Sequence, residues 1–182
     1  MRKLMIASDL HGDRECVEQL LRRYERSRAD RLVLLGDLLY HGPRNDLPEG
    51  YDPKGVIRLL NGVKNDLLCV RGNCDTEVDG MVLDFPIMAD YAYIAIDDFS
   101  FFATHGHKYN LDALPPLKRG EILLHGHTHI SAAEAFGDGN LYINPGSVSI
   151  PKSGTPKGYI EYIDGVIRFF TLDGEEYKRI EL

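Results

Sequence analysis

Tryptophan is absent from this 182-residue chain, and cysteine is scarce. The three cysteines, Cys16, Cys69 and Cys74, are an odd number without the regular spacing of a disulfide framework. That pattern predicts free thiols and a reducing compartment, because small secreted domains usually carry paired cysteines. We therefore expect a cytoplasmic protein.

Long hydrophobic runs and a surplus of positive charge are missing as well. The apolar run after Arg2 and Lys3 ends at Asp9, which is too early for a secretory signal peptide. No stretch approaches the roughly 20 apolar residues of a membrane span. The formal net charge is -7, whereas a broad nucleic-acid-binding surface should be basic. We expect no membrane contact and no extended nucleic-acid partner, although a local basic patch stays open.

The first part of the chain alternates apolar runs with amphipathic segments. Continuous apolar runs at 3–8, 31–37 and 67–73 predict buried strands. Between them, apolar residues recur at helical spacing after Asp13, a candidate helix cap, and again from Pro53 onwards. Strands that alternate with helices in this way predict parallel pairing with right-handed crossovers.

The second part of the chain is richer in antiparallel strands. Turn residues separate paired apolar segments within 91–106, 132–144 and 158–172, and the last pair is joined by Asp-Gly, a strong hairpin signal. Residues 177–182 could form one more strand. With no linker or repeat in view, we predict one domain over residues 1–182. Its class is α/β, with two mixed parallel and antiparallel sheets packed face to face and flanked by helices.

Seven polar side chains lie where predicted strands end. Ligands bind outside the carboxyl ends of strands in open α/β sheets, so these positions predict a site. The seven residues are Asp9, His11, Asp37, Asn73, His105, His127 and His129.

The types and spacing of these side chains indicate metal binding. Imidazole, carboxylate and amide groups suit Mn, Fe, Zn or Ni. Asp9 and His11 are two residues apart, as are His127 and His129, so an extended backbone would point each pair the same way. Adjacent glycines let the backbone approach closely. Seven ligands exceed what one ion takes and predict two ions that share a bridging carboxylate.

The motifs around these residues closely resemble those of the calcineurin-like metallophosphoesterases. They are DLHGD, GDLLYHGPRN, RGNCD, THGH and GHTH, in that order, within residues 9–129. With the later INPGSVSIPK, they are most similar to the small bacterial YfcE-type phosphodiesterases of that superfamily. The resemblance implies a two-sheet β-sandwich in a four-layer α/β/β/α fold.

The resemblance also implies an activity. It is hydrolysis of a small phosphodiester by a hydroxide that bridges two divalent metal ions, with Mn²⁺ favoured over Ni²⁺, Fe²⁺ and Zn²⁺. Asp37 would bridge the two ions. The other ligands of the first ion would be Asp9, His11 and His129. Those of the second ion would be Asn73, His105 and His127.

Cys74 stands where many members of that superfamily carry a histidine that stabilises the transition state or protonates the leaving group. A thiol is a weak acid at neutral pH, so we expect activated diesters to be hydrolysed better than those with poor leaving groups. The catalytic set is then Asp37, Asn73, Cys74 and Asp75. Asp75 could equally orient a ligand or cap a short helix.

Other polar residues leave alternatives open. His41, Arg44 and Asn45 follow the second strand and could reach the substrate phosphate, although His41 is as readily a packing residue. We interpret His125 as a packing or supporting residue, and His107 has the same alternative.

The competing functions are a non-catalytic scaffold of the same fold, a phosphomonoesterase and a nuclease. An exposed strand near the C-terminus would permit a homo-oligomer.

Overall fold

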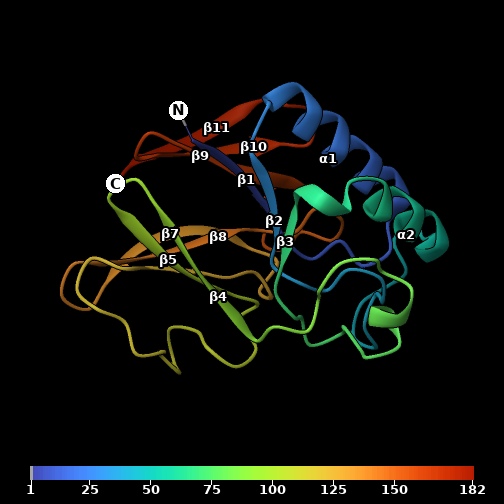
Figure 1. Ribbon diagram of the computed structural model, residues 1–182, viewed down its shortest axis with the longest axis horizontal. Helices are drawn as coiled ribbons and strands as arrows, with labels where there is room; N and C mark the ends of the chain where they lie inside the picture. The colour runs from blue at the N-terminus through green and yellow to red at the C-terminus, as the bar shows by residue number, and fades with distance from the viewer. Residues whose placement is uncertain (1) are drawn as a thin grey trace.

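The computed structural model describes residues 2–182, which form two β-sheets and two α-helices (Figure 1). The six-stranded sheet has the order β11-β10-β9-β1-β2-β3, and the five-stranded sheet has the order β4-β5-β6-β8-β7. The strands of the first are β1 (Lys3–Ala7), β2 (Arg31–Leu34), β3 (Leu67–Cys69), β9 (Gly158–Ile163), β10 (Val166–Thr171) and β11 (Glu176–Glu181). Those of the second are β4 (Tyr91–Ile96), β5 (Phe99–Thr104), β6 (Ile122–Leu124), β7 (Ser131–Phe136) and β8 (Asn140–Pro145).

The two helices are the crossovers between the parallel strands β1, β2 and β3. Helix α1 (Arg14–Ser27) begins where the Asp13 carboxylate accepts a hydrogen bond from the Cys16 amide at 3.0 Å. Helix α2 (Pro53–Gly62) begins with a proline, and the Asp52 carboxylate accepts from the Gly55 amide at 2.9 Å. Both helix starts fit the general preference for a capping acid, and both helices are where the sequence predicts them.

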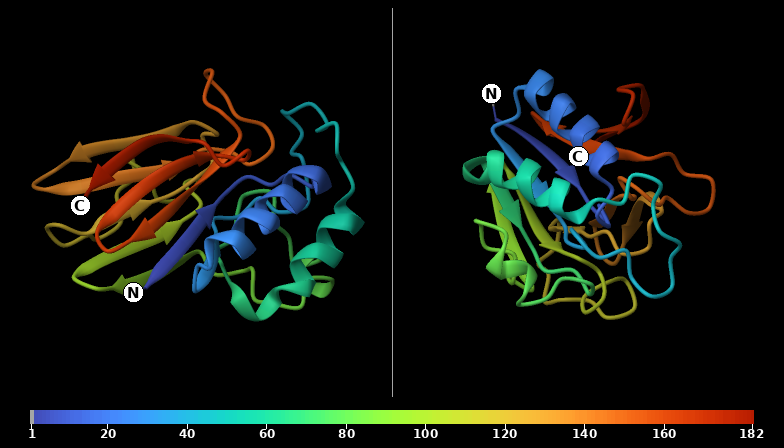
Figure 2. Two further views of the ribbon diagram at one scale, coloured as in Figure 1. Left: turned by 90° about the horizontal axis from the view of Figure 1, so that it is seen from above. Right: turned by 90° about the vertical axis from the view of Figure 1, so that its right-hand side faces the viewer.

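Alternate residues of β1 and β2 face two different cores. Met5 and Leu32 pack against both helices, which lie on the same side of the six-stranded sheet (Figure 2). Ile6 and Val33 face the other way and pack against the five-stranded sheet. This double burial explains why the first strands are continuous apolar runs.

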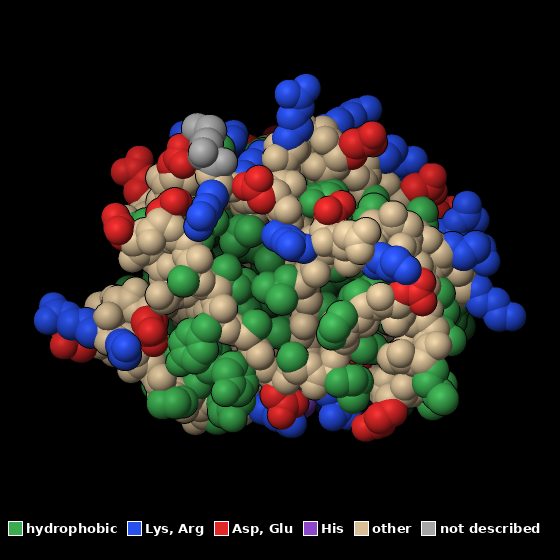
Figure 3. Space-filling view, in the orientation of Figure 1, with side chains coloured by type: hydrophobic (Ala, Val, Ile, Leu, Met, Phe, Trp, Pro, Cys, Tyr) green, Lys and Arg blue, Asp and Glu red, His purple; other side chains and the backbone are tan. Residues whose placement is uncertain are grey.

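The outer face of the five-stranded sheet differs from the predicted four-layer arrangement. Within residues 2–182, the loop between β5 and β6 covers it where helices were expected, and Tyr109 and Leu117 of that loop pack on Phe102. Consecutive prolines at 115 and 116 lack the amide hydrogens that a helix needs. Hydrophobic side chains gather at the lower left of the space-filling view, near this sheet (Figure 3).

The carboxyl ends of parallel strands from both sheets meet. Strands β1, β2 and β3 are parallel, and so are β5 and β6. The two groups are joined at these ends, because Nδ1 of His105, after β5, donates to the carbonyl of Leu35, after β2, at 2.7 Å. Neither α1 nor α2, the two α-helices within residues 2–182, has the length and apolar character of a membrane span.

Candidate metal centre

All seven predicted ligands come together at these strand ends, but their backbone differs from the extended conformation we expected. Asp9, His11, Asp37, His127 and His129 all have positive φ, between 47° and 65°. The paired spacing therefore works through left-handed residues and not through an extended segment. Such conformations destabilise a non-glycine residue by about 1–3 kcal/mol each and tend to cluster at functional sites.

Glycines let the ligand-bearing loops pack this tightly. A Cβ on Gly126 would lie 1.9 Å from Oγ of Ser8 and 2.6 Å from Oδ2 of Asp9. A Cβ on Gly72 would lie 2.1 Å from Oδ1 of Asp37. Neither distance is possible for a real side chain, so only glycine fits at these two positions.

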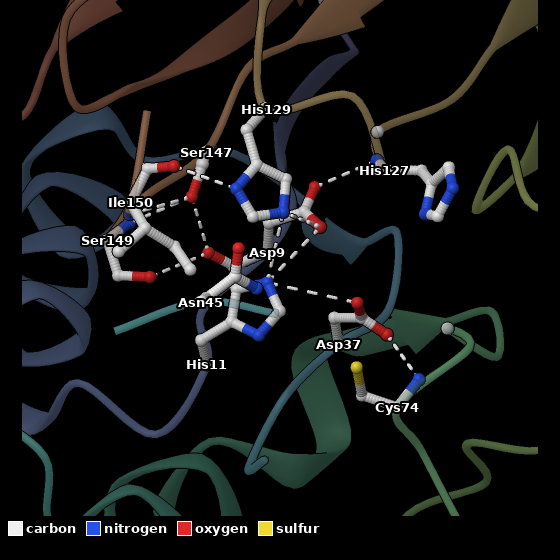
Figure 4. Close-up of polar contacts among 12 residues, drawn as sticks. Asp9, His11, Asp37, Asn45, Cys74, His127, His129, Ser147, Ser149 and Ile150 are labelled. Carbon is white, nitrogen blue, oxygen red and sulfur yellow. Dashed lines mark hydrogen bonds and ion pairs between the residues drawn. The ribbon is translucent and has the colours of Figure 1, made fainter. Parts of the chain in front are cut away.

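The first cluster joins Asp9, His11 and His129, whose side chains point toward one another (Figure 4). Nδ1 of His11 donates to the Tyr40 carbonyl at 2.8 Å, and Nδ1 of His129 donates to the Ile150 carbonyl at 2.7 Å. In a neutral imidazole the other nitrogen, Nε2, then carries a lone pair. The two Nε2 atoms face each other at 3.2 Å.

The Asp9 carboxylate places a negative charge beside these two Nε2 atoms. Its carboxylate is fully buried, and Oδ1 lies 3.2 Å from Nε2 of His129 while accepting no hydrogen bond within residues 2–182. Three acceptor atoms thus face one another in this buried cluster. Either protons or a cation must lie between them, and the donor set fits a divalent metal ion.

The second cluster is arranged around His105. Because its Nδ1 donates to Leu35, Nε2 is again the free lone pair of the neutral ring. This atom lies 3.0 Å from Oδ1 of Asn73 and 3.2 Å from Nδ1 of His127. The predicted set Asn73, His105 and His127 is therefore brought together as well.

Asp37 lies between the two clusters. Its Oδ2 is 3.8 Å from Nε2 of His11 and 3.4 Å from Nε2 of His105. Its Oδ1 is held by the Cys74 amide at 2.8 Å. One carboxylate oxygen thus faces both clusters, as a bridging ligand would.

Asp75 is close to the clusters but points elsewhere. Its buried carboxylate accepts hydrogen bonds from the amides of Asp37, Leu38 and Gly72 at 2.9, 2.8 and 2.7 Å. It therefore ties the loop after β2 to the loop after β3. Of the two alternatives left open, this geometry is that of a positioning residue.

Two serines that we did not single out support Asp9. Oγ of Ser147 and Oγ of Ser149 donate to the Asp9 carbonyl at 2.8 and 3.0 Å. Both lie in the NPGSVS stretch, so the motif was visible but the role of its hydroxyls was not. They hold the backbone of the first ligand in its left-handed conformation.

A small polar pocket opens beside the two clusters, and we call it the central pocket. Its lining includes Asp37, Arg44, Asn45, Asn73, Cys74, His127, His129 and Lys152. Sequence reasoning missed Lys152. His41 does not line the pocket, because its ring packs between Tyr40 and Tyr51 at 4.7 and 5.4 Å.

Comparison with known proteins agrees with this geometry. The calcineurin-like phosphoesterase superfamily domain matches residues 2–162. The chain belongs to this superfamily. Phosphodiesterase YfcE of Escherichia coli strain K12 is 48% identical over 159 residues, which are 87% of this chain and 86% of that protein.

Solved structures confirm the predicted fold class. The E. coli phosphoesterase YfcE has a TM-score of 0.94 at 44% identity, and the match covers 98% of both chains. A structure of Vps29 from Entamoeba histolytica has a TM-score of 0.64 over 99% of both chains. At 20% identity, that second likeness concerns the fold alone.

Divalent metal ions are typical of this phosphoesterase superfamily. The pKa of His105 predicts how metal binding should depend on pH. Burial lowers the pKa of His105, but its contacts with Asp37 and Asp9 outweigh burial and raise the pKa to about 9. In the metal-free protein His105 is therefore protonated below about pH 9, and a metal ion must displace that proton. We expect proton release on Mn²⁺ binding at pH 7, and affinity that rises toward pH 9.

Isothermal titration in two buffers with different ionisation enthalpies measures this release. The number of protons released should be about one or more at pH 7 and clearly smaller near pH 10. Equal proton release at both pH values would contradict the assignment of His105 as a ligand.

Proposed function

We propose that this phosphoesterase is a metal-dependent phosphodiesterase that uses two divalent cations, with Mn²⁺ as the expected metal. The observation that supports this most strongly is that two buried clusters of imidazole, carboxylate and amide side chains both face Oδ2 of Asp37. The identity to phosphodiesterase YfcE supports the choice of a diester as substrate.

The residues divide between the two cations as follows. Asp9, His11 and His129 would hold one, Asn73, His105 and His127 would hold the other, and Asp37 would contact both. Two cations at such a site make a water molecule acidic near neutral pH and offset the negative charge of the phosphate.

The chain itself supplies positive charge for the phosphate. Arg44 and Lys152 both line the central pocket, and Asn45 lies beside them as a hydrogen-bonding group. Arginine binds phosphate oxygens in a fixed fork, and lysine binds them as a point charge. We assign phosphate binding to Arg44, Asn45 and Lys152, and we leave His41 out of this group.

Cys74 limits the range of leaving groups. Burial, followed by the charge of Asp37, raises the pKa of its thiol to about 12. A thiol this weak is a poor general acid at neutral pH, so good leaving groups such as aryl oxides, which need no proton to depart, should be preferred.

Replacing Cys74 with histidine tests this preference. Across a series of aryl and alkyl diesters, Cys74→His should raise kcat/KM for the poorest leaving groups about tenfold or more relative to the best. Cys74→Ser, which adds no acid, should leave the dependence on leaving-group pKa unchanged. A uniform rate change across the series in Cys74→His would contradict the role given to this position.

The proposed reaction is tested by hydrolysis of bis-p-nitrophenyl phosphate with metal-stripped protein to which Mn²⁺ is added. Turnover should require the metal, and the monoester p-nitrophenyl phosphate should be a poorer substrate. Folded protein that hydrolyses neither ester with Mn²⁺, Ni²⁺, Fe²⁺ or Zn²⁺ would contradict the proposal and favour the scaffold.

The substrate, the cellular compartment and the oligomeric state are also proposals. The polar central pocket, with Arg44 and Lys152 in its lining, supports a small phosphodiester as the substrate, while the net charge of -7 argues against extended nucleic acid. A reducing compartment and a homo-oligomer through an exposed sheet edge stay predictions.

A further inference from the structure

Two larger cavities adjoin the central pocket, each at a different residue of its lining. The first, which we call the β7 cavity, has a volume of about 320 Å³ and shares His127 with the central pocket. The second, the α2 cavity, has a volume of about 390 Å³ and shares Cys74 with it. Both fall within the roughly 300–1,000 Å³ of pockets that hold small organic ligands.

The β7 cavity is mainly apolar. Ile130, Ala132 and Tyr142 contribute to its lining, with Leu111 from the opposite loop. Ile130, Ala132 and Glu134 share one side of the β7 segment, because side chains alternate along a strand. The cavity thus lies on the outer face of the five-stranded sheet, next to the second ligand cluster.

The α2 cavity is also mainly apolar and borders the central pocket at Cys74. Ile57 of α2, Tyr40 and Tyr51 line it together with Val78. Val78 is 66% exposed, so this cavity opens to solvent.

The central pocket differs from the two cavities in the charged side chains that line it. Arg44 and Lys152 line the central pocket, whereas the described residues that line the two cavities include no arginine or lysine. Asp112 and Glu134 line the β7 cavity, and neither forms an ion pair within residues 2–182. A second anionic group would therefore be repelled from the β7 cavity, while an uncharged or cationic group would not.

We propose that the phosphate of the substrate lies in the central pocket and that its two ester arms occupy the two cavities, one in each. The substrate is then an open-chain diester of two apolar alcohols that are uncharged or cationic. A monoester leaves one cavity empty, and a cyclic diester cannot reach both. This inference rests on the proposed function and adds the substrate class to it.

The test compares two inhibitors in the Mn²⁺-loaded full-length protein. Diphenyl phosphate has two large arms and dimethyl phosphate has two small ones, and each competes with hydrolysis of bis-p-nitrophenyl phosphate. The ratio of their inhibition constants is measured within one protein sample, so it does not depend on the fraction that is folded or metal-loaded.

One substitution fills each cavity. Ala132→Phe fills the β7 cavity, with Ala132→Leu as a smaller replacement if the phenylalanine prevents folding, and Val78→Trp fills the α2 cavity. The matched controls are Ala135→Phe, on the opposite face of the same strand, and Met81→Trp, at a residue that is 82% exposed and lines neither cavity.

We expect each cavity variant to raise the inhibition constant of diphenyl phosphate about tenfold, because an aryl ring loses its apolar site. The constant for dimethyl phosphate should not change, and the controls should match the wild type for both inhibitors. An unchanged ratio in either cavity variant overturns the inference while leaving the diesterase function intact. A wild type without diester turnover would overturn the proposed function itself, and this inference with it.

Discussion

Replacing Asp37 with asparagine should lower kcat/KM for bis-p-nitrophenyl phosphate by on the order of a thousandfold. The amide has the same shape, so it can still accept the hydrogen bond from the Cys74 amide. It lacks the charge that faces both His11 and His105 through Oδ2. The substitution should therefore weaken binding of both metal ions and leave the fold in place.

Steady-state kinetics at saturating Mn²⁺, with circular dichroism to confirm folding, measures this effect. Asp66→Asn is the matched control, because Asp66 is exposed in the short 3-10 helix Lys64–Asp66 and lines neither the central pocket nor its flanking cavities. An Asp37→Asn enzyme that kept more than a tenth of wild-type turnover would show that Asp37 bridges nothing essential.

Replacing Asp75 with asparagine should destabilise the metal-free protein by about 3 kcal/mol. The Asp75 side chain is buried and both of its oxygens accept hydrogen bonds from backbone amides. An asparagine turns one acceptor into a donor, so at least one buried amide hydrogen would face another donor. The loops that carry Asp37 and Asn73 would then lose their shared anchor.

Urea unfolding of metal-free Asp75→Asn and wild type measures this loss, with Asp66→Asn again as the control. We expect a lower midpoint for Asp75→Asn alone, and diester turnover reduced less than in Asp37→Asn. Unchanged stability with abolished turnover would instead indicate that Asp75 takes part in the reaction directly, as its place in the predicted catalytic set implies.

Much of the fold followed from local sequence patterns. Strand β1 is a continuous apolar run because it is buried on both faces, and Asp13 and Pro53 mark helix starts that need no tertiary information. The loop before β6 was harder to predict, because the four-layer expectation came from resemblance and not from the residues. Its paired prolines at 115 and 116 were the available signal against a helix.

The ligands of the candidate site were predictable because they lie at strand ends, whereas their supporting contacts were not. The left-handed backbone of Asp9 and His127 arises from tertiary packing, which no spacing rule contains. The same holds for the carbonyls that fix the histidine tautomers, such as that of Ile150, which is distant from His129 in sequence. Backbone carbonyls leave no residue-specific signal, so only the structure could show them.

The central claim is that two metal ions act together at a site bridged by Asp37. The most direct test is to titrate metal-stripped protein with Mn²⁺ while following bound metal and diester turnover in the same samples. The account predicts two Mn²⁺ bound per chain and turnover that reaches its plateau only with the second equivalent. A plateau at one equivalent, or two bound ions without turnover, would contradict it.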